Sequence, residues 1–152
     1  MSELRDLYQE VILDHGKNPR NHGRPVGCNR KSHGYNPLCG DKVTIYLNVE
    51  DGVVTDVGFE GAGCAISMAS ASLMTEILKG KTVEEAAAIF NRFRDIVMGQ
   101  DDPVVDFGDS PDFDRLLVLS GVREFPMRVK CATLAWHTMT AAVEGQDEVS
   151  TE

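Results

Sequence analysis

An Asp51-Gly52 pair between two alternating segments most restricts the fold of this chain. Apolar and polar residues alternate over 43–49, which is typical of a β-strand that is buried on one face. Val53, Thr55, Val57 and Phe59, at every second position, indicate its partner strand. Asp-Gly is a preferred sequence for a two-residue type I′ turn. The sequence therefore predicts a β-hairpin in which Glu50 faces Val53, with the same register continuing outward from the turn.

Extending this register away from the turn brings residues with metal-binding side chains together. Asp41 is expected across from Ala62, and Cys39 across from Cys64. Directly opposed residues have Cβ atoms about 4.5–5.5 Å apart, so the two sulfurs could share one metal ion. Because glycines at 40, 61 and 63 loosen the ladder, the prediction concerns proximity and not ideal pairing.

Helical signals surround the hairpin, so the sequence predicts an α+β fold. Apolar periodicity and capping signals favour helices over 2–14, 64–79, 82–98, about 110–119 and from just after Pro126 to 144. The segment 30–35 is compatible with a short strand. Cys64 and Cys131 are expected in the first turns of two helices, where exposed N–H groups favour thiolate over thiol.

Composition excludes several classes of protein. The formal net charge of −9 argues against a nucleic-acid binder, which needs a basic face. No apolar segment approaches the roughly 20 residues that span a bilayer, and the first residues do not resemble a secretory signal. A cytoplasmic location without membrane partners is therefore expected. Six aspartates gather in the segment 101–114, for which the sequence indicates no function.

The four cysteines, at positions 28, 39, 64 and 131, carry the candidate chemistry. Three thiolates, from Cys39, Cys64 and Cys131, could form a tetrahedral zinc site with the carboxylate of Asp41. Two simpler interpretations stay open: the cysteines could be small buried hydrophobic residues, and Asp41 could be an ordinary turn residue.

Two cations stand just before the last cysteine of this set. Arg128 and Lys130 could offset the negative charge of a thiolate cluster. Alternatively, they belong to a solvated helix face.

Four motifs resemble a known family. They are Asp14-His15 with 18–21 (Asn-Pro-Arg-Asn), 36–41 (Asn-Pro-Leu-Cys-Gly-Asp), 61–67 (Gly-Ala-Gly-Cys-Ala-Ile-Ser) and 129–136 (Val-Lys-Cys-Ala-Thr-Leu-Ala-Trp). Together they are similar to the U-type iron–sulfur cluster assembly proteins, the family of IscU, SufU and the NifU N-terminal domain. Two features resemble the SufU branch. Lys130 stands where IscU-type scaffolds have histidine, and the sequence between Cys64 and Cys131 is longer than in those scaffolds.

The resemblance implies a fold, a ligand set and a function. The fold would be a three-stranded antiparallel sheet packed against about five helices, SufE/NifU-like, in a single domain over 1–145. Residues 99–125 would be a branch-specific insertion and 146–152 a disordered tail. Cys39, Asp41, Cys64 and Cys131 would bind Zn²⁺. The protein would accept persulfide sulfur from a cysteine desulfurase and pass it to downstream iron–sulfur assembly proteins.

Cys39 is the expected sulfur acceptor, because it lies on a loop flanked by proline and glycine while Cys64 and Cys131 lie at helix starts. It would act by thiolate attack on the terminal sulfur of a persulfide. Two other functions stay open: a scaffold that holds a transient [2Fe–2S] cluster with the same ligands, and a zinc-stabilised interaction module.

Cys28 and His33 could form a second metal cluster with Cys39, but the family motifs do not use them, so Cys28 is expected to be a free or packed thiol. His15, Arg20 and His22 are expected in a solvated loop, with a role in partner docking as the alternative.

Overall fold

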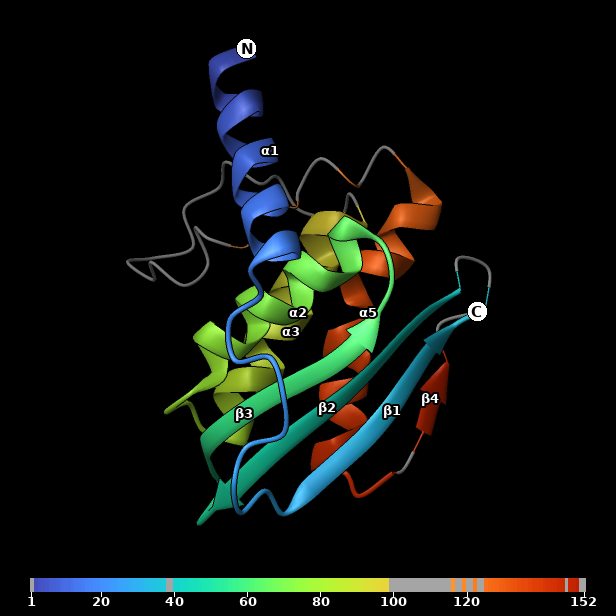
Figure 1. Ribbon diagram of the computed structural model, residues 1–152. Helices are drawn as coiled ribbons and strands as arrows, with labels where there is room; N and C mark the ends of the chain where they lie inside the picture. Colours follow the sequence, from blue (N-terminus) through green and yellow to red (C-terminus); the bar gives the residue numbers. More distant parts are fainter. Residues whose placement is uncertain are drawn as a thin grey trace.

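The computed structural model describes residues 2–37, 40–98, 116, 119, 122, 125–146 and 148–150. This part of the chain contains the helices α1 (Ser2–Lys17), α2 (Ala65–Leu78), α3 (Val83–Val97) and α5 (Pro126–Val143). Its strands are β1 (Arg30–Asn36), β2 (Asp41–Glu50), β3 (Val53–Ala62) and β4 (Glu148–Ser150). They form one sheet in the order β3-β2-β1-β4. Figure 1 shows this sheet in front of α5, with α1 beyond one end of the sheet.

The predicted hairpin is confirmed. Strands β2 and β3 pair antiparallel, and Glu50 faces Val53. Asp51 and Gly52 both have positive φ angles, of 53° and 77°, as a type I′ turn requires. On the helix-facing side of β2, Val43, Ile45 and Leu47 are buried, in agreement with the alternation in the sequence.

The continued register of this hairpin is wrong by one residue, because β3 contains a β-bulge. Val49 faces Val54, but Asn48 faces Asp56, so Thr55 is an extra residue in β3. The Asn48 amide donates to Thr55 Oγ1 over 3.0 Å, and Thr55 Oγ1 donates to the Asn48 carbonyl over 3.1 Å. A bulge shifts the pairing of all residues beyond it. Lys42, and not Asp41, consequently faces Ala62.

The other two strands complete the sheet. Strand β1 confirms the short strand compatible with segment 30–35, and it pairs antiparallel with β2. The three antiparallel strands are those that the family resemblance implies. The expectation of a disordered tail from residue 146 is wrong in part, because Glu148–Ser150 pair in parallel with β1. This pairing provides hydrogen-bond partners for backbone N–H and C=O groups on the outer edge of β1.

The helices follow the sequence signals closely. Thr82 and Glu85 form the expected capping box at the start of α3, and Gly80 follows α2 with a positive φ of 85°. The described residues contain four helices and not five, and the helix expected over 110–119 falls mainly outside them. No helix in the described part is both long and apolar enough to cross a membrane.

Helix α5 begins earlier than the sequence predicted. Pro126 is its first residue, a position that suits proline because the first N–H groups of a helix have no partner within it. Cys131 therefore lies in the second turn and not in the first. The expected effect of exposed helix N–H groups on this thiol does not apply. Cys64, in contrast, is the N-cap residue of α2.

The core lies between the sheet and the helices α2, α3 and α5 (Figure 1). Its largest buried side chains include Trp136, Phe59, Phe93, Ile45 and Leu47. Helix α2 is buried around most of its circumference and has many small residues. Small side chains let α1 and α5 approach it closely. The Ser70 hydroxyl, which accepts a hydrogen bond from Trp136 Nε1 over 3.1 Å, links α2 to α5.

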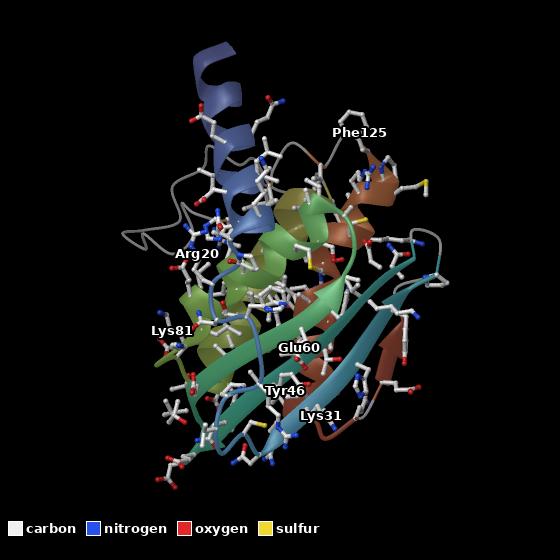
Figure 2. All side chains as sticks on the ribbon, in the orientation of Figure 1. Arg20, Lys31, Tyr46, Glu60, Lys81 and Phe125 are labelled. Atoms are coloured by element: carbon white, nitrogen blue, oxygen red, sulfur yellow. The ribbon has the colours of Figure 1, made fainter. Side chains whose placement is uncertain are left out.

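The end of α1 and the segment that follows it are anchored to α2 and are not the solvated loop expected from the sequence. His15 is buried, with its Nδ1 atom 2.7 Å from Ser72 Oγ. The backbone N–H of Arg20 donates to the same hydroxyl over 2.9 Å. The chain then passes the outer face of the sheet, where Tyr46 donates a hydrogen bond to Glu60 (Figure 2). The two contacts with Ser72 fix the end of α1 against the middle of α2.

Gly34 on β1 allows α5 to lie directly on the sheet. A Cβ atom at this position would overlap Thr138 Oγ1 and lie 3.2 Å from Leu134 Cδ1. The variant Gly34→Ala is expected to lower the free energy of unfolding by about 1–3 kcal/mol, as overpacking commonly does. Urea denaturation measures this change. In the double variant Gly34→Ala/Thr138→Ala the loss should be smaller than the sum of the single losses, and strictly additive losses would contradict the contact.

Candidate metal centre

Asp41, Cys64 and Cys131 converge where the sheet meets the starts of α2 and α5. One ligand atom from each residue lies within 4.8 Å of the other two. Asp41 is the first residue of β2, Cys64 is the N-cap of α2, and Cys131 lies in α5. Asp41 and Cys131 are buried and Cys64 is partly exposed. Residues distant in sequence thus form one polar cluster that is accessible from the side of Cys64.

A hydrogen bond from the backbone of Cys64 holds the carboxylate of Asp41. The Cys64 N–H donates to Asp41 Oδ1 over 3.0 Å, which satisfies a free donor at the N-terminus of α2. Asp41 Oδ2 lies 3.7 Å from Cys64 Sγ. One carboxylate oxygen therefore caps the helix, and the other is directed at the sulfur atoms.

Gly63 makes this approach possible. A Cβ atom at Gly63 would lie 2.5 Å from Asp41 Oδ1 and 2.9 Å from its Cγ, closer than a side chain can come without displacing the carboxylate. The glycine is thus required by the position of Asp41.

Cys131 is enclosed by polar groups of two elements. Its Sγ atom is 3.6 Å from the carbonyl oxygen of Met127 and 3.8 Å from Nδ2 of Asn36. Arg128 is exposed, and its hydrogen bond with Cys131, together with the charge interaction with Cys64, raises the pKa of its guanidinium above the ordinary value. A permanent cation therefore stands at the entrance to the two sulfur atoms.

Of the other residues considered for the site, Cys39 is not described by the structure, whereas Lys130, Cys28 and His33 are. Cys39 lies outside the described residues, so its predicted place opposite Cys64 has no described geometry; with the bulge, the register that suggested it no longer applies. Lys130 is partly exposed on α5, next to Cys131 in sequence. Cys28 is partly exposed, and His33 forms a hydrogen bond between its Nδ1 atom and Thr44 Oγ1 over 2.8 Å. Neither belongs to the metal-binding group found among the described residues.

The donor set suits zinc. Ligands at zinc distances of about 2.0–2.3 Å in a tetrahedron lie about 3.3–3.8 Å from one another, and the 3.7 Å between Cys64 Sγ and Asp41 Oδ2 falls in this range. Two thiolates and one carboxylate are also ligand types that zinc prefers. A fourth ligand has to come from another residue, for which the sequence predicts Cys39.

Comparison with known proteins agrees with this fold. The sequence profile of the NifU-like N terminal domain matches residues 7–110. The "Zinc-dependent sulfurtransferase SufU" of Bacillus subtilis is 40% identical over 146 residues, which cover 96% of this chain and 95% of that protein. The "Iron-sulfur cluster assembly scaffold protein IscU" of Streptococcus pyogenes is 37% identical over 144 residues, covering 95% of this chain and 87% of that one.

A solved structure is similar over almost the same length. It is the "Putative iron-sulfur cluster assembly scaffold protein for SUF system" from Fervidobacterium islandicum, with a TM-score of 0.79 and 34% identity. The match covers 88% of this chain and 94% of that one. The chain therefore belongs to the U-type iron–sulfur cluster assembly family, which contains IscU, SufU and the NifU-like N-terminal domain.

Two residues at this site have roles that the sequence reasoning missed. Asn36 and Gly63 both belong to the family motifs, and Gly63 is one of the glycines expected to loosen the ladder, but the sequence does not predict a contact of either residue with a ligand. The signal for Asn36 is its position at the end of β1, on the same face as Ser32 and Gly34. The close contact of Gly63 with Asp41 depends on the bulge, so the simple register could not reveal it.

Gly63→Ala is expected to weaken zinc binding about tenfold to a hundredfold, the usual effect of disturbing the support of a ligand. The added methyl group would push Asp41 away from the sulfur atoms. Competition with a chromophoric chelator measures the affinity. Gly16→Ala is the matched control, because its added Cβ would make an ordinary 3.6 Å contact with Ala65. Equal affinities of the two variants would contradict this role of Gly63.

Proposed function

We propose that this protein is a zinc-dependent sulfur acceptor that takes persulfide sulfur from a cysteine desulfurase for iron–sulfur cluster assembly. The observation that carries the proposal is the convergence of Asp41, Cys64 and Cys131 within 4.8 Å. The similarity to the sulfurtransferase SufU over nearly the full length of both chains supports it further. So does Lys130, which stands where IscU-type scaffolds have histidine.

Cys39, Asp41, Cys64 and Cys131 would hold the zinc ion. Bound zinc supplies charge that keeps coordinating thiols deprotonated at neutral pH. Arg128, beside Cys131 and Cys64, offsets the negative charge of three thiolates and a carboxylate. The same cation faces any anionic group that enters from the exposed side, and a persulfide on a partner enzyme is such a group.

The sulfur transfer is a thiol exchange. The acceptor thiolate attacks the terminal sulfur of the desulfurase persulfide, a new S–S bond forms on the acceptor, and the S–S bond on the desulfurase breaks. The electron pair of the broken bond leaves with the desulfurase cysteine as a thiolate. No external oxidant or reductant is needed, because the transferred sulfur keeps its oxidation state.

Access decides which cysteine can act as the acceptor. Cys131 is fully buried, which disfavours attack on a persulfide held by another protein. Cys64 is partly exposed, but its backbone is fixed as the N-cap of α2. Pro37 and Gly40, which flank positions 38 and 39 in the sequence, are both exposed. These facts favour Cys39 as the acceptor.

Cys39→Ala is expected to abolish uptake of sulfur from a cysteine desulfurase. Labelled cysteine as the sulfur source, followed by mass spectrometry of the intact protein and its peptides, locates the transferred sulfur. Cys28→Ala is the matched control and should accept sulfur normally, because Cys28 lies outside the cluster. Persulfide on Cys64 or Cys131 of the Cys39→Ala variant would contradict the assignment.

A transient [2Fe–2S] scaffold is the second candidate, because two of the similar proteins are named as scaffolds and thiolates also bind such clusters. Anaerobic purification with metal analysis, combined with a desulfurase assay, separates the two functions. Zinc and a strong stimulation of the desulfurase are expected for the sulfur acceptor. Iron and sulfide without stimulation would indicate the scaffold, and zinc without stimulation an interaction module.

A further inference from the structure

Asn36 is a buried polar residue beside the metal centre whose hydrogen bonding is incomplete. It ends β1, is 1% exposed and faces Asp41 in the sheet. Its Nδ2 atom donates to Cys131 Sγ over 3.8 Å, whereas its Oδ1 atom has no hydrogen-bond partner among the described residues. Half of the buried amide is thus paired, and the partner is a sulfur atom of the site.

An amide in this position is an unfavourable choice for stability alone. A buried carbonyl oxygen without a donor loses its hydration and gains nothing in return. An apolar side chain of similar size would avoid that loss, and Val43 and Ile45 occupy the same face of the sheet. The contact with Cys131 is the feature that distinguishes the amide from such a residue.

The hydrogen bond from Asn36 contributes differently when Cys131 is a neutral thiol and when its sulfur is bound to a metal. A neutral Cys131 thiol can donate its own hydrogen to the Met127 carbonyl, 3.6 Å away. A sulfur atom bound to a metal has no hydrogen to donate and carries negative charge, so it benefits from a donor. Hydrogen bonds to metal ligands also fix the direction of the ligand.

We infer that Asn36 is a positioning residue, whose amide N–H directs Cys131 Sγ toward Cys64 and Asp41 and stabilises it as a ligand. The inference rests on the proposed metal centre. Because Asn36 and Asp41 are paired in the sheet, one end of the β1–β2 pair positions both the carboxylate ligand and the buried thiolate ligand.

Asn36→Leu and Asn36→Ala test this role, with Ser32→Ala as the control. Leucine replaces the amide by an apolar group of similar size, and alanine removes it. Ser32 lies on the same face of β1 and is also buried, with a hydroxyl that has no partner among the described residues. It is separated from Asn36 along the strand by Gly34, so its loss should leave the metal centre unchanged.

Two measurements report on the metal site independently of sulfur transfer. Chelator competition gives the zinc affinity, which should fall about tenfold to a hundredfold in both Asn36 variants. In the cobalt-substituted protein, the thiolate-to-cobalt charge-transfer band should move to longer wavelength. Loss of a hydrogen bond raises the energy of the sulfur electrons, and a change in folding alone does not produce this shift. Thermal unfolding of the metal-free variants identifies those that fold.

The outcomes separate this inference from the proposed function. A weaker affinity and a shifted band in a folded Asn36 variant, with both unchanged in Ser32→Ala, support the inference. Unchanged affinity and spectrum in a folded Asn36 variant overturn it, as does an equal loss in Ser32→Ala. A wild-type protein that binds neither zinc nor cobalt would instead refute the proposed metal centre, before any variant is compared.

Discussion

The hydrogen bond from the Cys64 N–H to Asp41 Oδ1 connects the sheet to the start of α2, and the geometry of the site depends on it. It satisfies a helix N-terminus that no side chain of α2 caps. The second carboxylate oxygen, Oδ2, is the one that is directed at the sulfur of Cys64. A metal held here would therefore be bound by Asp41 through one oxygen, with the helix start and the ligand positioned by the same residue.

Cys64 and Cys131, the two cysteines of the metal-binding cluster, differ in what surrounds them. Cys131 is fully buried and close to Asn36, Met127 and Arg128, whereas Cys64 is partly exposed at the site entrance. A buried ligand with hydrogen-bond donors around it is difficult to displace. In the proposed zinc site, Cys131 would therefore be the anchoring ligand, and exchange with a partner's sulfur would take place on the exposed side.

Much of the fold could be predicted from local signals in the sequence. The Asp51-Gly52 turn, the alternation in β2 and the capping box at Thr82 depend on neighbouring residues only. The bulge, the parallel pairing of β4 and the anchoring of His15 to Ser72 depend on tertiary contacts. One sign of the bulge was present, because the buried residues Val54 and Val57 are an odd number of positions apart. The hairpin register predicts only that Cys39 lies near Cys64, and beyond the bulge it is shifted by one residue; the prediction that Asp41 and Cys131 belong to the same site rests mainly on the family motifs.

Because of the bulge at Thr55, the geometry of the site depends on whether residues are gained or lost from β3 in odd or in even numbers. The side chains of a strand point alternately to its two faces, so removing one residue would reverse the face presented by every position between the bulge and Cys64. A change of two residues would preserve the faces. Sequences that keep this site are therefore expected to differ in the length of β3 by even numbers, or to compensate an odd change with a second bulge.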